Sequence, residues 1–81
     1  MPQDPIEEAR AVLEELRAVP FVWREVPGPA GVRAFRGTAP GWSASVGRFG
    51  ETYFAVVSRG SLIVRVPDAG ELYARAAVGV P

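Results

Sequence analysis

The side chains that could do chemistry in this 81-residue chain are carboxylates, arginines and hydroxyls, because the sequence contains no His, Cys or Lys. Acid–base and nucleophilic catalysis near neutral pH usually depends on one of these absent residue types, whose pKa can be brought toward 7. Structural zinc is bound mainly by thiolate and imidazole, and neither group is present. We therefore expect a protein that is not an enzyme, with no catalytic residues, no cofactor and no metal site.

Four glutamates of one predicted helix are the residues best suited to binding a hard cation, namely Glu7, Glu8, Glu14 and Glu15. However, Arg10 and Arg17 stand three or four residues from members of this set, which is the spacing of ion pairs on a solvated helix face. We expect ion pairs there and no bound cation.

A second set of residues could form an interaction surface on predicted strands and turns: Trp23, Arg33, Arg36, Trp42, Arg48, Arg59 and Arg65. If several of these arginines share the sheet face opposite the helices, they could contact phosphate while a tryptophan stacks on a base. The alternative is that strand arginines keep an open face hydrated and that the tryptophans anchor a core or an interface. The glycines of residues 37–41 predict a hairpin turn, because no lysine follows them to complete a phosphate loop.

Charge and composition exclude several classes of function. The nine arginines are balanced by nine acidic residues, and the calculated pI is near 6.2. This counts against a dedicated nucleic-acid binder and gives no support for binding to an anionic membrane. With no apolar run of about 20 residues and no secretory signal, we expect a cytoplasmic protein. The lack of Lys, Asn, His and Cys fits a GC-rich coding sequence or a heat-adapted source.

Two helices are predicted at the ends of the chain. Asp4 and Pro5 form an N-cap and first-turn signal, Glu7 stands where it can return a bond to the cap, and Pro20 ends the run, so the first helix should cover residues 5–19. Its apolar stripe consists of Ile6, Ala9, Val12, Leu13, Leu16 and Val19. Asp68 is the predicted N-cap of the second helix, which should cover residues 69–77 and stop at Gly79.

Between these helices the apolar period changes to two, which predicts strands at residues 21–26, 32–36, 42–48, 52–58 and 61–66. The intervening Gly- and Pro-rich turns are too short for crossover helices, so neighbouring strands should pair antiparallel. Residues 52–58 alternate apolar side chains on both sides and should form a central strand buried on both faces. The sequence thus predicts one domain over residues 1–81, an α+β two-layer sandwich with a meander of four to five strands between terminal helices.

Residues 54–66 (FAVVSRGSLIVRV) resemble the hairpin of the TfoX amino-terminal domain and the related MmcQ/YjbR group, and residues 68–78 resemble the helix that follows it. Together these segments cover about a third of the chain. The Met-Phe-Gly motif that often opens the TfoX sheet is missing. The resemblance implies terminal helices on an antiparallel sheet, as in the bacterial frataxin type, and a small regulatory protein. Some members are suspected of contacting DNA, and no catalytic residue carries over.

We therefore expect a non-catalytic interaction or regulatory module that acts through protein contacts at an exposed sheet face or edge. Because so short a chain has a thin core and no disulfide or metal to reinforce it, self-association as a homodimer is also expected. Two alternatives stay open. One is a weak nucleic-acid-binding module that uses the strand arginines, and the other is a small-ligand domain with a pocket lined by Trp42, Tyr53 and Tyr73.

Overall fold

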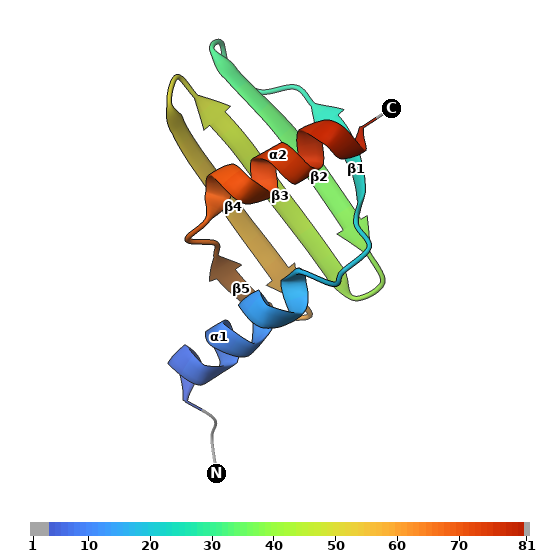
Figure 1. Cartoon of the computed structure of the whole chain (residues 1–81), viewed down its shortest axis with the longest axis vertical. Coiled ribbons are helices and arrows are strands. Elements are labelled where there is room, and N and C mark those ends of the chain that lie inside the picture. The colour runs from blue at the N-terminus through green and yellow to red at the C-terminus, as the bar shows by residue number, and fades with distance from the viewer. Residues whose placement is uncertain (1–3, 81) are drawn as a thin grey trace.

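A computed structural model describes residues 4–80 of the chain. These residues form two helices and five strands: α1 (Pro5–Leu16), β1 (Val22–Val26), β2 (Val32–Ala39), β3 (Trp42–Phe49), β4 (Thr52–Arg59), β5 (Leu62–Arg65) and α2 (Ala69–Gly79). The strands make one antiparallel sheet in the order β1-β2-β3-β4-β5. Figure 1 shows α2 crossing this sheet and α1 lying at one end of the molecule beside β5. The predicted α+β fold is confirmed.

Three two-residue turns fix the strand register from β2 to β5. In each turn one glycine has a positive φ, namely 78° at Gly41, 60° at Gly50 and 59° at Gly60, a backbone region that glycine enters without steric cost. The predicted loop over residues 37–41 is wrong in extent. Gly37 pairs with Ala44 and the pairing continues to the end of β2, so only residues 40 and 41 form the turn.

The two faces of the sheet have different surroundings. Alternate strand residues point to the face that carries both helices, here called the helix face, and they form the core together with α1 and α2. The buried core residues of the strands and of the segment after β5 are Trp23, Phe35, Ala44, Val46, Ala55, Val57, Val64 and Val66. The helices add Val12, Leu16, Ala69, Leu72, Tyr73 and Ala76. The opposite face of the sheet carries no helix, and it is called the open face below.

The prediction that residues 52–58 form a central strand buried on both sides is wrong. The middle strand is β3, and β4 lies next to the edge strand β5. On β4, Ala55 and Val57 are buried under the helices, whereas Phe54 and Val56 are 46% and 40% exposed on the open face. An apolar side chain on each side of a strand therefore reflects an uncovered apolar surface here, and not a second buried layer.

The helix ends follow the predicted signals only in part. Asp4 caps α1 as predicted, with its Oδ1 accepting a 2.9 Å hydrogen bond from the Ile6 amide. The helix ends at Leu16, earlier than expected, because the amides of Ala18 and Val19 bond to carbonyls three residues back and tighten the last turn. Pro20 also disfavours helical geometry at the residue before it.

The second helix is capped differently from the prediction. The Asp68 side chain makes no capping hydrogen bond, and the Asp68 carbonyl instead accepts from the amides of Glu71 and Leu72 at 3.1 and 3.3 Å. The helix also continues through Gly79 to a C-cap at Val80. The Asp68 carboxylate is thereby left available to the cleft described below.

The indole of Trp23 fastens the sheet to α2. Trp23 is 5% exposed and lies between two glycines, one on the neighbouring strand β2 and one in the last turn of α2. A β-carbon at Gly37 would stand 2.7 Å from Trp23 Cζ3, and one at Gly79 would stand 2.8 Å from Trp23 Cδ1. Real β-carbon contacts are not this short, so the ring can fit only because both residues lack side chains.

We predict that Gly37→Ala destabilises the protein by about 1–3 kcal/mol, because the added methyl group overpacks the Trp23 site. Gly70→Ala is the matched control. Its new β-carbon would make only ordinary contacts, the nearest at 3.6 Å to Tyr53, and alanine favours the helix by up to about 1 kcal/mol. Urea unfolding followed by tryptophan fluorescence measures both variants. Equal stability of Gly37→Ala and the wild type would show that Trp23 is not held between the glycines.

Candidate functional site

The open face is the largest surface of the sheet that no element covers within residues 4–80. Its exposed or half-buried side chains are Val22, Arg24, Val26, Val32, Ala34, Arg36, Thr38, Ser43, Ser45, Phe49, Thr52, Phe54, Val56, Ser58, Ile63 and Arg65. Apolar, hydroxyl and arginine side chains make up the whole set, and no strand residue on this face is acidic. The strands contain one carboxylate, Glu25, and it points to the helix face.

Three arginines of the open face fall in one line across the strands. Arg24 pairs with Arg36, Arg36 with Ser45, Ser45 with Val56, and Val56 with Arg65. Arg24, Arg36 and Arg65 are called the arginine row below. None of the three forms an ion pair within the part of the chain that the structure describes. Like charges directly opposite each other on neighbouring strands are unfavourable, so Arg24 and Arg36 leave a positive charge that the protein itself does not neutralise.

Large apolar side chains share this face with the arginine row. Val22 and Ile63 are 73% and 71% exposed at the two edges of the sheet, and Phe49 is 58% exposed near the β3–β4 turn. Phe54 lies over Gly47 on the neighbouring strand, where an added β-carbon would be 2.2 Å from the Phe54 ring. The ring therefore covers an otherwise bare stretch of backbone and keeps much of its own surface exposed.

The structure divides the predicted interaction residues between the two faces. Arg36 and Arg65 lie on the open face as part of the arginine row. The others lie on the helix face: Trp23, Arg33, Trp42, Arg48 and Arg59. The reason is the two-residue period of a strand, which sends residues an odd number of positions apart to opposite faces. Arg24 is absent from the predicted set. Because it follows the buried Trp23 directly on the same strand, strand alternation indicates that it lies on the open face.

The helix-face arginines are engaged with neighbouring side chains. Arg33 Nε lies 3.3 Å from Glu25 Oε2, and Arg59 Nη1 lies 2.5 Å from Glu15 Oε2. Each pair is about half exposed, so each contributes at most about 1 kcal/mol. The ion pairs expected between Arg10 or Arg17 and the glutamates of α1 are not formed within residues 4–80, and Glu15 pairs with Arg59 on β4. No three acidic side chains of these residues lie close enough to hold a metal ion.

Arg48 belongs to an aromatic cluster under α2. Its guanidinium stands 5.8 Å from the centre of the Tyr73 ring, and a hydrogen bond with Tyr53 raises the pKa of Arg48 above its ordinary value. The Tyr73 ring meets Phe35 and Tyr53 edge-on, each at 5.3 Å between centres. Tyr73 is buried, and its hydroxyl has no hydrogen-bond partner in the part of the chain that the structure describes. The cluster therefore packs Tyr73 into the core.

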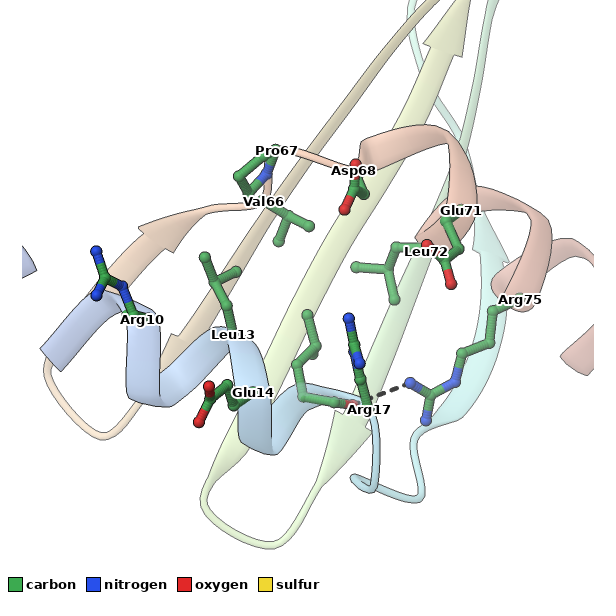
Figure 2. Close-up of a pocket in the computed structure, with 11 residues that line it drawn as sticks. Arg10, Leu13, Glu14, Arg17, Val66, Pro67, Asp68, Glu71, Leu72 and Arg75 are labelled. Atoms are coloured by element: carbon green, nitrogen blue, oxygen red, sulfur yellow. Dashed lines mark hydrogen bonds between the residues drawn. The ribbon is translucent and has the colours of Figure 1, made fainter. Parts of the chain in front are cut away.

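A cleft of about 700 Å³ lies between α1 and α2, as Figure 2 shows. Leu13, Leu16, Val66 and Leu72 form its apolar part. Its charged side chains are Arg10, Glu14, Arg17, Asp68, Glu71 and Arg75. Trp42, Tyr53 and Tyr73, which were predicted to line a ligand pocket, do not line this cleft. Trp42 lines a separate hollow of about 320 Å³ next to Val19 and Pro20. The position of the cleft depends on how the two helices are placed, which strand periodicity does not reveal.

Arg75 closes one end of the cleft and ties the two helices together. It donates one hydrogen bond of 3.0 Å to the carbonyl of Leu16 (Figure 2). It donates a second to the carbonyl of Val19. Its guanidinium also stands 5.6 Å from the centre of the Phe21 ring. The last carbonyls of a helix have no partner within that helix, so Arg75 serves as the C-terminal cap of α1.

Comparison with known proteins finds no matching family model, no matching curated protein and no matching solved structure. The resemblance to the TfoX amino-terminal domain therefore stays a prediction. Neither helix among residues 4–80 is long and apolar enough to cross a membrane.

We predict that Arg75→Met lowers the free energy of unfolding by about 1–3 kcal/mol, because it removes two charge-assisted hydrogen bonds from α2 to the carbonyls of Leu16 and Val19. Arg17→Met is the matched control, since Arg17 lines the same cleft and its side chain makes no hydrogen bond within the described residues. Guanidinium unfolding followed by circular dichroism measures both. Equal losses in the two variants would contradict the role of Arg75 as a cap.

Proposed function

We propose that the protein is a non-catalytic binding module whose open face docks onto a partner protein. One observation carries the proposal: a single uncovered face combines exposed apolar side chains with three arginines and has no carboxylate on its strands. Aromatic residues and arginine are the residue types enriched at protein interfaces. An arginine row without an internal partner is suited to acidic groups supplied by another molecule.

The amount of exposed surface supports the proposal. The chain exposes 5732 Å², whereas a compact monomer of 8.7 kDa exposes about 4700 Å². The difference of about 1000 Å² is similar to the surface of about 800 Å² that each partner buries in an interface of standard size. The shape is elongated, 45 × 24 × 19 Å, and an elongated chain exposes more surface than a compact one of the same mass.

The chemistry of the open face favours binding over catalysis. A guanidinium keeps its proton throughout the physiological pH range and cannot act as a base. The hydroxyls of Ser43 and Ser58 bond to each other at 2.8 Å, and a hydroxyl nucleophile needs an adjacent base. With no carboxylate on the strands of this face, no such base is at hand.

Single-stranded nucleic acid is the second candidate, and the arginine row beside the exposed Phe49 and Phe54 is the observation that favours it. The protein partner is favoured for two reasons. The tryptophans that could stack on bases lie on the helix face, where Trp23 is buried. The chain is also neutral overall, so the rest of the molecule carries an acidic excess that opposes a long polyanion.

Peptide phage display on the immobilised protein, followed by titration of recovered peptides into ¹⁵N-labelled protein, tests the proposal. We predict that bound peptides are rich in acidic and apolar residues and shift amide resonances of the strands that carry the arginine row, from β1 to β5. Arg36→Glu should weaken binding by about tenfold or more. The matched control is Arg33→Glu, a charge reversal on the same strand but on the helix face, and it should leave binding unchanged.

An oligothymidylate of about 15 nucleotides, titrated at about 0.15 M salt, is the parallel arm. We expect no shifts on the open face. Tighter binding of the oligonucleotide than of any peptide would replace the proposal with a nucleic-acid function. Peptide-induced shifts confined to the helix face, or the absence of any peptide that shifts the open face, would contradict the proposal directly.

A further inference from the structure

The arginine row has a length and a direction that a partner must match. Neighbouring strands lie about 4.8 Å apart, so the backbones of Arg24 and Arg36 are separated by about 5 Å, and Arg65 lies about 14 Å beyond Arg36. The row therefore spans about 19 Å and runs across the strands. Ser45 and Val56 lie between Arg36 and Arg65, so the positive charge is concentrated toward the two ends of the row.

Apolar side chains lie beside the row mainly on one side of it. The next line of cross-strand partners consists of Val26, Ala34, Gly47 and Phe54, and the line beyond that contains Val32 and Phe49. The apolar residues of these two lines are called the apolar band. On the other side of the row Thr38, Ser43 and Ser58 place hydroxyls, with Val22 and Ile63 only at the sheet edges. Lines on one face are two residues, or about 7 Å, apart.

We infer, on the premise that the open face binds a protein, that the partner segment is an acidic amphipathic α-helix lying across the strands. Its acidic flank follows the arginine row, and its apolar stripe rests on the apolar band. A helix about 10 Å wide covers the row and the nearer line of the band, which are about 7 Å apart, and a span of about 19 Å corresponds to about 13 residues. Its carboxylates are needed near both ends, where they meet the Arg24–Arg36 pair and Arg65.

An extended segment fits this surface less well than a helix does. The residues of a strand that face one surface form a single line at every second position. Such a line can meet the arginine row or the apolar band, but not both. A helix presents residues at i, i+3, i+4 and i+7, which form a stripe wide enough for two neighbouring lines. The sheet already accommodates a helix in this direction, because α2 crosses β1 to β4 on the helix face (Figure 1).

A second copy of this chain is a poor occupant of the open face. Two open faces packed together would bring two arginine rows into contact. The chain's own acidic helix, α1, has its apolar residues Val12 and Leu16 buried in the core, and Arg10 and Arg17 interrupt its glutamates. The charges therefore favour a partner other than the chain itself, and the predicted homodimer would need another surface.

Two synthetic helical peptides of about 15 residues and identical composition test the inference. In the patterned peptide, leucines form one stripe and glutamates the adjacent flank, and in the scrambled peptide the glutamates are spread around the helix. We predict that the patterned peptide binds the ¹⁵N-labelled protein at least about tenfold more tightly than the scrambled peptide, and that its affinity falls as salt rises. Arg36→Glu and Arg65→Glu should each weaken its binding several-fold, whereas Arg33→Glu should not.

The outcomes separate this inference from the proposed function. If both peptides bind equally and shift the open face, the inference of a helical partner segment is overturned and the proposed protein-binding function stands. The same conclusion follows if phage-display peptides bind the open face and the patterned peptide does not. If no peptide shifts the open face, both proposals fall. If sedimentation shows a wild-type oligomer that Arg36→Glu disperses, the occupant is a second copy and the inference is overturned. Spectra of each variant before titration confirm that it is folded.

Discussion

A five-stranded sheet has two faces, and the helices of residues 4–80 cover only one of them. Every other feature of the molecule depends on this constraint. Because side chains alternate along a strand, each strand sends its core residues toward α1 and α2 and its remaining residues to a surface without a second layer. That surface holds the arginine row, the exposed valines, isoleucine and phenylalanines, and the serine and threonine hydroxyls.

The covered face is fastened by a few specific contacts. Trp23 fits between Gly37 and Gly79, which brings the last turn of α2 down onto β1 and β2. Arg75 caps the end of α1 and links it to α2 through hydrogen bonds to the carbonyls of Leu16 and Val19. These contacts belong to the packing of the core on the helix face. Arg75, one of the charged residues of the cleft between the helices, takes part in them. Within residues 4–80 the arginine row has no comparable partners, which is why we propose that the open face is the binding surface.

Much of the fold could be predicted from the sequence because its signals are local. Short runs of alternating apolar residues between glycine turns gave the five strands, and Asp4 with Pro5 gave the start of α1. Facing was harder. The alternation of Phe54 and Val56 with Ala55 and Val57 cannot distinguish a doubly buried strand from one with an exposed apolar side, since both have the same pattern. The burial of Trp23 depends on a glycine 56 positions away in α2, and no local pattern carries that information.

The candidate site was predicted in part for the same reason. Arg36 and Arg65 were predicted as surface arginines. Their alignment in one row with Arg24, however, depends on the registers of all four strand pairs from β1 to β5. Arg33, Arg48 and Arg59 were grouped with them by residue type, although strand parity places them on the helix face. The cleft between α1 and α2 depends on helix placement and had no sequence signal.

Paramagnetic relaxation of methyl groups by a neutral gadolinium chelate tests most directly whether one face of the sheet is uncovered. The account predicts strong relaxation of the Val56 and Ile63 methyl groups on the open face, and protection of Val57 and Val64, which lie next to them on the same strands but under the helices. Protection of all four residues in the free protein would mean that both faces are covered, and it would contradict the account.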